Sequence, residues 1–422
     1  MNIELKVAFF GLSHLGIVSL ISLASKHVHC IGVDLDAQLV SELARQKWPI
    51  QEPEIDEVYN VGKSFITFSS DPTSLRECDI VYISQDVPTD DFGKSNLGGV
   101  EALIDLAAKN LSKEARIVVL CQVPPGFTRR MKKYHLNISY QVETLVFGQA
   151  FGRALKPERI IVGVESPTAS LDPNYVHILE QFACPVLLMD YESAEFTKIS
   201  INALLAATVT TTNALNEIAK SVGANWDSVQ KALRLDRRIG PYAYLKPGLG
   251  ISGGNIERDL QTLNELEQNP PGESNLFRTY LENSQRQKRW IFDSIKENIL
   301  DINSESRIGI LGIAYKENTD SIKNSVALEV IDSFTDNIIG VYDPIATLPS
   351  TFKFIKQFES AEDCIRDADA VVVMTPWEQF SHFNFPQLFG EHAKPLVVID
   401  PYGILNLDSL PPEITVIDLT RR

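Results

Sequence analysis

The sequence predicts an α/β protein with two parallel-sheet domains joined by a long central helix. Two sets of short, β-rich segments, each alternating with helical patterns, predict the sheets, and one long helix-like run separates them. A chain of 422 residues is also too long for a single hydrophobic core. We expect a first sheet domain at residues 1–188, a helical connector at 189–300 and a second sheet domain at 301–422.

The first sheet is predicted from apolar segments that are separated by amphipathic stretches. In chain order these segments are KVAFFGL (6–12), HCIGVDLD (29–36), IVYIS (80–84), RIVVLCQV (116–123) and RIIVGV (159–164). Short strands that alternate with helices are typical of a parallel sheet with helices on its faces.

The connector begins with the run at 192–223, which is much longer than an ordinary globular helix. The βα alternation then returns in RIGILGIAYK (307–316), IIGVYDP (338–344), AVVVMTP (370–376) and LVVID (396–400). We therefore expect an active cleft between the two sheet domains.

Composition excludes several classes of partner. The formal net charge of −16 argues against nucleic acid or an anionic membrane as the main partner. The five cysteines form no C-x-x-C pair, so we expect neither a metal site nor a disulfide framework. The N-terminal segment lacks the features of a secretion signal, and no apolar run reaches the length of about 18 residues that a membrane span requires. We expect a cytoplasmic protein.

A glycine-containing turn follows the first predicted strand. Gly11, Ser13 and Gly16 lie in FFGLSHLG, and Asp34 follows at the end of the second predicted strand. In a Rossmann-like domain such glycines let a pyrophosphate approach a helix N-terminus, and the acid binds the adenine ribose. The pattern predicts a dinucleotide site, and Asp34 favours NAD because a carboxylate repels the 2′-phosphate of NADP. The alternative is a plain βα turn.

Nearly the whole chain resembles the UDP-glucose/GDP-mannose dehydrogenase family, whose members use NAD to oxidise the primary alcohol of a nucleotide sugar to a carboxylate. The matching segments, in the family's order, are PIQEP (49–53), VPPGFT (123–128), YQVETLVFGQAFGRALKPERIIVG (140–163), AEFTKISINALLA (194–206), DRRIGPYAYLKPGLG (236–250) and GIAYKENTDSIKNS (312–325). Several matches in the same order are more specific than any one motif. The resemblance implies two Rossmann-like domains, NAD as cofactor and a nucleotide-sugar substrate, most simply a UDP-sugar.

The resemblance also assigns site residues. It places Glu143 on the catalytic glutamate, Lys198 and Asn202 on the active-site lysine and asparagine, and Asp259 on the catalytic aspartate; Pro124 falls among the cofactor contacts. It implies contacts with the nucleotide sugar from Leu145, Arg238, Tyr244, Gly250, Lys316 and Lys323.

Each of these assignments has a simpler alternative or a further implication. Lys198 and Asn202 lie four residues apart on one helix face, and the alternative is that both side chains simply face solvent. The alternative for Asp259 is a capping residue of the helix that follows the glycine loop. In the family Arg238 reaches the substrate of a neighbouring subunit, and dimers form around the long helix. We therefore expect a homodimer or a higher homo-oligomer.

The loop GLGISGGNIERD (248–259) departs from the family pattern G-x-G-x-G-G-x-C-x-x-x-D, because Asn255 stands where the catalytic cysteine belongs. Other positions also differ from the family pattern: Gln122 replaces a threonine, Glu257 a common proline, Lys323 an arginine, and Tyr402 the arginine of D-G-R. The second oxidation in the family passes through a thioester, which an amide does not form. We therefore predict oxidation by two electrons, from an alcohol to an aldehyde or a ketone.

Two other functions remain open at this point. One is an epimerase or dehydratase in which tightly bound NAD removes and returns a hydride without net redox change. The other is a catalytically silent protein that binds a nucleotide sugar. Asn255 itself has two interpretations: a catalytic group, or an ordinary turn residue after two glycines.

Overall fold

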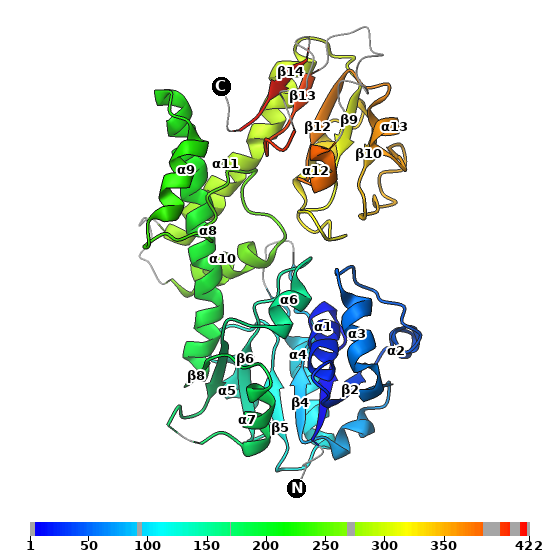
Figure 1. Cartoon of the computed structure of the whole chain (residues 1–422), viewed down its shortest axis with the longest axis vertical. Coiled ribbons are helices and arrows are strands. Elements are labelled where there is room, and N and C mark those ends of the chain that lie inside the picture. Colours follow the sequence, from blue (N-terminus) through cyan, green and yellow to red (C-terminus); the bar gives the residue numbers. More distant parts are fainter. Residues whose placement is uncertain are drawn as a thin grey trace. The chain divides into compact units, whose positions relative to one another are not determined.

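The chain divides into two compact units in a computed structural model (Figure 1): the first unit, Met1–Ile201, and the second unit, Asn202–Arg422. The structure describes residues 5–90, 95–168, 170–267, 275–382, 397–405 and 414–419. Within these ranges no helix has both the length and the apolar character needed to cross a membrane. The expected division at residues 188 and 300 stays a prediction.

The first unit is built on an eight-stranded sheet in the order β3-β2-β1-β4-β5-β6-β7-β8. Neighbouring strands are parallel except for the pair β6 and β7, which is antiparallel. The strands are β1 Lys6–Phe10, β2 His29–Val33, β3 Ile66–Ser69, β4 Ile80–Ile83, β5 Arg116–Val119, β6 Ile138–Val142, β7 Ile160–Val164 and β8 Val186–Asp190. Because β1 lies between β2 and β4, strand order reverses beside β1, where Rossmann-like sheets bind their ligands.

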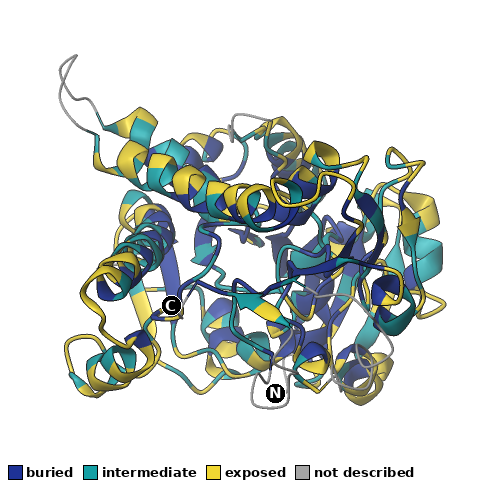
Figure 2. Cartoon of the chain, turned by 90° about the horizontal axis from the view of Figure 1, so that it is seen from above, coloured by how far each residue is buried: buried dark blue, intermediate teal, exposed yellow. Residues whose placement is uncertain are grey.

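Helices cover both faces of this sheet. They are α1 His14–Ala24, α2 Ala37–Leu43, α3 Ile55–Gly62, α4 Gly98–Asn110, α5 Phe127–Met131, α6 Ala150–Leu155 and α7 Pro173–Glu180, with short 3-10 helices at Lys63–Phe65 and Pro72–Glu77. Apolar residues of α1, α3, α6 and α7 pack on one face, and those of α4 and α5 on the other. Figure 2 shows the result: the strands are buried and the outer sides of the helices are exposed.

The predicted long helix is confirmed as α8, Tyr191–Val222. Among the described residues between α8 and the second sheet, three further helices are present: α9 Trp226–Leu235, α10 Asn255–Leu266 and α11 Leu276–Ile295, which continues into a π-helical turn at Lys296–Leu300.

The second unit contains a six-stranded sheet in the order β11-β10-β9-β12-β13-β14, with parallel neighbours throughout. Its strands are β9 Ile308–Leu311, β10 Ile338–Tyr342, β11 Lys356–Gln357, β12 Ala370–Val373, β13 Val397–Ile399 and β14 Thr415–Ile417. Its helices are α12 Val326–Ser333, α13 Ala361–Ile365 and α14 Glu378–Ser381. The prediction of two Rossmann-like, parallel-sheet domains with a long central helix is therefore confirmed.

Candidate functional site

The turn between β1 and α1 has the backbone geometry of a phosphate-binding loop. Gly11 has a left-handed φ of +93°, and a Cβ atom there would lie 2.8 Å from Cβ of Gln85. A Cβ atom on Gly16 would lie 2.3 Å from the carbonyl oxygen of Gly11, so neither position accepts a side chain. The hydroxyl of Ser13 donates to the carbonyl oxygen of Ser84 at 2.8 Å and does not cap α1. The first turn of α1 is therefore suited to an anion such as pyrophosphate.

Asp34 lies beside this loop, directly after β2. Its Oδ2 accepts a hydrogen bond from the Leu12 amide at 2.7 Å, and its Oδ1 accepts one from the Asp36 amide at 2.9 Å. Both carboxylate oxygens are thus fixed at the strand end where Rossmann-like domains bind the adenine ribose. The residues of this loop fit NAD.

A buried carboxylate that sequence reasoning missed joins the first turn of α1 to the start of α6. Glu52 is only 7% exposed and pairs with Nε2 of His14 at 2.8 Å. It also accepts hydrogen bonds from the amides of Gly148 at 2.8 Å and Ala150 at 3.1 Å. The PIQEP segment therefore ties the first turn of α1 to the start of α6, and its partners, two of them backbone groups, leave no trace in the sequence pattern.

A second missed carboxylate holds the loop that contains Pro124. Glu195 on α8 is fully buried and accepts hydrogen bonds from the amides of Gly126 at 2.5 Å and Thr128 at 2.7 Å. Burial raises the pKa of Glu195, and these two amides oppose the rise. Its place three residues before Lys198, one turn away on the same helix, was the one available signal.

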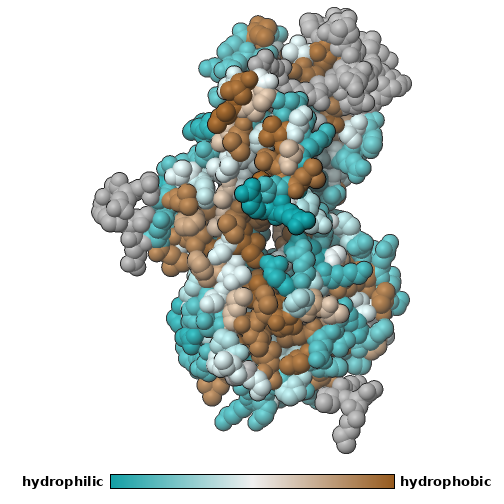
Figure 3. Space-filling model, turned by 60° about the vertical axis from the view of Figure 1, so that its left-hand side comes forward, coloured by the Kyte–Doolittle hydropathy of each residue, from teal (hydrophilic) through white to brown (hydrophobic). Residues whose placement is uncertain are grey.

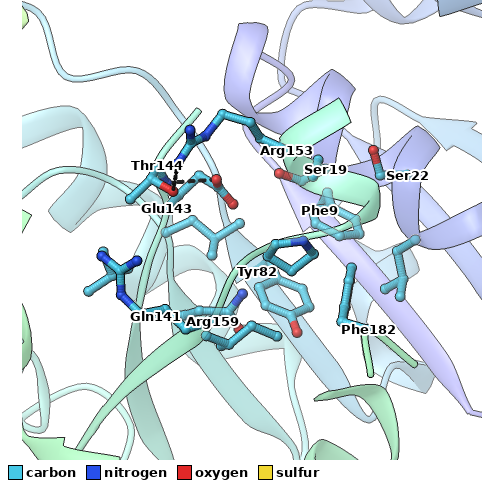
Figure 4. Close-up of a pocket in the computed structure, with 16 residues that line it drawn as sticks. Phe9, Ser19, Ser22, Tyr82, Gln141, Glu143, Thr144, Arg153, Arg159 and Phe182 are labelled. Carbon is cyan, nitrogen blue, oxygen red and sulfur yellow. Dashed lines mark hydrogen bonds between the residues drawn. The ribbon is translucent and has the colours of Figure 1, made fainter. Parts of the chain in front are cut away.

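Glu143 follows β6 directly and is the candidate catalytic group of the first unit. Its Oε1 accepts a hydrogen bond from the Thr144 amide at 2.7 Å. Burial raises the pKa of Glu143, while this hydrogen bond and the positive charges of Lys198 and Arg153 act in the opposite direction. Figure 4 shows Glu143, Thr144 and Arg153 together at one end of a pocket. Leu145, two residues after Glu143, is partly buried and packs against the core of the sheet.

Asn202 and Asp259 form the centre of the candidate site in the second unit. The Asn202 amide on α8 donates from Nδ2 to Oδ2 of Asp259 on α10, at 2.6 Å. Both side chains are buried, with exposures of 8% and 2%. Nε of Arg258 lies 3.8 Å from the other carboxylate oxygen of Asp259. Asp259 is therefore held by side chains, as a group with a defined orientation requires.

The glycine loop before α10 is closely packed and ends at Asn255. Gly250, with a φ of +86°, lies against Ser284 of α11, whose hydroxyl accepts a hydrogen bond from the Ile251 amide at 2.8 Å. A Cβ atom on Gly253, where φ is +89°, would lie 2.5 Å from the ring of Tyr315. Gly254 has a φ of +82° and precedes Asn255, which is exposed and begins α10. Asn255 thus stands at the N-terminus of a helix on a rigid loop.

Several predicted substrate residues surround this loop. The side chain of Lys323 passes 3.3 Å from the place where Gly254 would carry a Cβ atom. Nζ of Lys316 lies 5.7 Å from the centre of the Tyr315 ring. The carbonyl oxygen of Tyr244 accepts a hydrogen bond from Thr212 at 2.9 Å. These contacts place both lysines on the segment that packs against the glycine loop.

Two other positions behave differently. The hydroxyl of Tyr402 donates to the carbonyl oxygen of Met374 at 3.1 Å, so this tyrosine is held by backbone and supplies no positive charge. Arg238 is an exposed side chain that forms a bidentate pair with Asp236, at 3.0 and 2.7 Å. A role of Arg238 toward a neighbouring subunit stays a prediction.

None of the five cysteines, all of which lie in the described ranges, has the surroundings of a nucleophile. Burial raises the pKa of Cys78 to about 11 and that of Cys364 to about 12. It raises the pKa values of Cys30 and Cys121 still further, and it also raises that of the less buried Cys184. Reactive cysteines are instead partly exposed, with lowered pKa values. No described group of three or more histidine, cysteine, aspartate or glutamate side chains could hold a metal ion.

The chain matches three models of one family. Residues 5–182 match the NAD binding domain of the UDP-glucose/GDP-mannose dehydrogenase family, residues 192–285 match its central domain, and residues 309–407 match its UDP binding domain. A UDP-glucose 6-dehydrogenase of Rickettsia prowazekii is 26% identical over 414 residues, which covers 93% of this chain and 94% of the relative. A UDP-glucose 6-dehydrogenase of Caenorhabditis elegans is 26% identical over 446 residues, covering 96% and 92%.

Solved structures show the same fold. A UDP-D-ManNAc dehydrogenase from Pyrococcus horikoshii aligns with a TM-score of 0.85 at 21% identity, over 99% of both chains. A UDP-glucose dehydrogenase from Pyrobaculum islandicum aligns with a TM-score of 0.83 at 22% identity, over 99% of this chain and 98% of the other.

Proposed function

Since the chain belongs to the UDP-glucose/GDP-mannose dehydrogenase family, whose models match it from the NAD binding domain to the UDP binding domain, we propose that it oxidises a UDP-sugar alcohol by two electrons and releases an aldehyde or a ketone. The chemistry that NAD supplies when bound is the acceptance of a hydride. Gly11, Ser13, Gly16 and Asp34 hold this cofactor, and Pro124 contributes from the loop that Glu195 fixes.

The single observation that carries the limit of two electrons is Asn255. It stands at the place of the family's catalytic cysteine, and an amide neither loses a proton at neutral pH nor adds to an aldehyde as a thiolate does, to give the thiohemiacetal whose oxidation yields a thioester. A replacement thiol would have to be reactive, and burial raises the pKa of every cysteine in the chain. The acid-forming half of the family's reaction therefore lacks its nucleophile.

The first oxidation requires less of the protein. The alcohol loses a hydride and a proton, and the proton needs an acceptor within hydrogen-bond reach or one water away. We assign Asp259 as the acceptor of this proton, which reaches its carboxylate through a water molecule. Asn202 orients this carboxylate. The ammonium of Lys198 stabilises the negative charge that develops on the alcohol oxygen. Glu143 has no thioester to hydrolyse and is left to act as a base.

The nucleotide part is bound by the second unit. Gly250 and Tyr244 belong to the loop region before α10, and Lys316 and Lys323 supply positive charge for the diphosphate. Tyr402, which stands where the family has an arginine, is neutral and supplies none; its hydroxyl donates a hydrogen bond to the carbonyl oxygen of Met374. In the first unit Leu145 contacts the sugar. These assignments follow the family resemblance, residue by residue.

We also propose that the protein works as a homodimer that forms through α8. Leu204, Leu215, Ile218 and Val222 are exposed by 71%, 42%, 57% and 71%, and their spacing puts them on one face of this helix. Figure 3, which brings the side of α8 forward, shows hydrophobic residues gathered on that side. Exposed apolar residues along one helix face are typical of an interface. The molecular mass in solution tests this proposal, and a monomer at micromolar concentration would contradict it.

The proposed reaction is tested by the number of NADH molecules formed per sugar consumed. Purified protein and NAD are incubated with a panel of UDP-, GDP- and dTDP-sugars, and the products are identified by mass spectrometry. One NADH together with an aldehyde or keto sugar supports the proposal. Two NADH with a uronic acid contradict it. An altered sugar without NADH would indicate internal redox, as in an epimerase, and binding without any product would indicate a catalytically silent protein.

A further inference from the structure

A pocket lies in the first unit between α1, α6 and one face of the sheet (Figure 4). It contains about 570 Å³ of empty space, a figure that includes open solvent at its mouth. Ser22, which lines it, is about 13 Å along α1 from Ser13, at the rise of 1.5 Å per residue of a helix. Gly11, Ser13, Gly16 and Asp34 do not line the pocket, which is therefore separate from the phosphate loop.

One side of the pocket is aromatic. The rings of Phe9 on β1 and Tyr82 on β4 are stacked, with centroids 4.9 Å apart and planes 10° from parallel. Phe182 lies beside them along the same wall (Figure 4). Aromatic faces of this kind pack against flat, apolar groups.

Polar atoms without partners line the same space. Within the described part of the chain, Ser19 Oγ, Ser22 Oγ and Arg153 Nε are buried and form no hydrogen bond to another protein group, although a terminal nitrogen of Arg153 donates to Oγ1 of Thr144 at 3.4 Å. Ser22 is only 1% exposed. Buried polar groups are almost always paired, and three unpaired donors around one pocket indicate an occupant that offers acceptors.

The charged side chains that line the pocket also favour an anionic ligand. Arg153 and Arg159 both line it, and both have Glu158 as their acidic neighbour, at 3.9 and 3.4 Å. One carboxylate therefore faces two guanidinium groups. Glu143 also lines the pocket, and the positive charges of Arg153 and Lys198 act on its carboxylate.

We propose that this pocket is a second ligand site, which takes a small organic anion with a flat apolar body. The carboxylate of the ligand lies on Arg153 and on the hydroxyls of Ser19 and Ser22, and its apolar body packs on Phe9 and Tyr82. Glu143 lines the same pocket, so the ligand contacts a candidate catalytic group and acts as an effector of the oxidation; this consequence, unlike binding itself, rests on the proposed function.

The test uses benzoate as probe, on the full chain, by isothermal titration calorimetry. We expect saturable binding that persists with saturating NAD, because the pocket is separate from the phosphate loop. Arg153→Met removes a charged donor and is expected to weaken binding by about tenfold or more. Arg130→Met is the matched control, because Arg130 packs over the Phe127 ring in the same unit but does not line the pocket. Benzyl alcohol, which keeps the ring and lacks the charge, is expected to bind more weakly than benzoate.

Three results would overturn the proposal: no saturable binding of benzoate, equal affinity in Arg153→Met and Arg130→Met, or equal affinity for benzyl alcohol. If Arg153→Met does not fold, as judged from its thermal midpoint, Ala154→Phe replaces it, because this change fills the pocket from a half-buried position. None of these readouts depends on turnover, so failure of the proposed reaction leaves them unaffected.

Discussion

The hydrogen bond between Asn202 and Asp259 should be worth more than an ordinary one, because its acceptor is a buried carboxylate. Asn202→Ala leaves Oδ2 of Asp259, in a side chain that is 2% exposed, without the donor that lies 2.6 Å away. A hydrogen bond to a charged group contributes about 1.5–3 kcal/mol, against about 1 kcal/mol for a neutral pair. We expect Asn202→Ala to lower the free energy of unfolding of the second unit by about 2 kcal/mol.

The chain offers a matched control on the same helix. Asn216 is also 2% exposed, and its Nδ2 donates to the carbonyl oxygen of Leu419, again at 2.6 Å. Asn216→Ala should therefore cost about 1 kcal/mol, since its acceptor is neutral. Urea unfolding followed by tryptophan fluorescence measures both variants. Equal losses in the two variants would refute the assignment of Asp259 as a held carboxylate.

Asn202→Ala should also slow the oxidation, because Asp259 loses its orientation. If the proton acceptor is Asp259, kcat/KM falls by at least about tenfold, which corresponds to about 1.4 kcal/mol. The same assay with Asn216→Ala should give the rate of the unchanged protein. A normal rate in Asn202→Ala would remove Asp259 from the reaction while leaving the stability argument intact.

Three further predictions concern the first unit. Because burial raises the pKa of Glu143 above its ordinary value of 4.5, ionisation of Glu143 opposes folding. Below pH 4.5 the wild type and Glu143→Gln should be equally stable, and the wild type should lose stability relative to the variant as the pH rises through the raised pKa. Urea titrations across pH measure this difference, and a difference that does not depend on pH would contradict the raised pKa. Asp34→Ala should weaken the binding of NAD by about tenfold and the binding of NADP by less, as measured by fluorescence titrations. An unchanged ratio of the two dissociation constants would argue against a contact between Asp34 and the ribose. Glu195→Ala removes the acceptor of two loop amides and should weaken NAD binding by about tenfold. Glu192→Ala breaks an exposed ion pair with Arg129 and should leave NAD binding unchanged. Equal effects of the two changes would exclude a role of Glu195 in holding the Pro124 loop.

Much of the fold follows from apolar periodicity, which missed the largely buried strand β6 and less buried strands, among them β3, β8 and β11. β3 and β8 have no buried residue, and β11 has only two residues. β3 and β11 lack the continuous apolar run that marks the buried strands β1, β4 and β5, whereas β8 contains one, at residues 186–189, that is not buried. Their place in the sheet depends on pairing with distant segments, which is not visible in a local sequence pattern.

The site was only partly predictable, for a related reason. The resemblance supplied Asn202 and Asp259 separately, but their hydrogen bond joins residues 57 positions apart. Glu52 and Glu195 were missed because most of their partners are backbone amides, which every residue type carries. Conversely, Asn255 is conspicuous only in the sequence, since an exposed asparagine after two left-handed glycines is structurally ordinary.

The measurement that tests the central claim most directly compares wild type with Asn255→Cys in the number of NADH molecules formed per UDP-sugar. The account predicts one NADH and an aldehyde or ketone from wild type, and a second NADH with a carboxylic acid once the thiol is present. Cys184→Ser, which changes the least buried native cysteine, should leave the wild-type product unchanged. A uronic acid and two NADH from the wild-type protein would contradict the account.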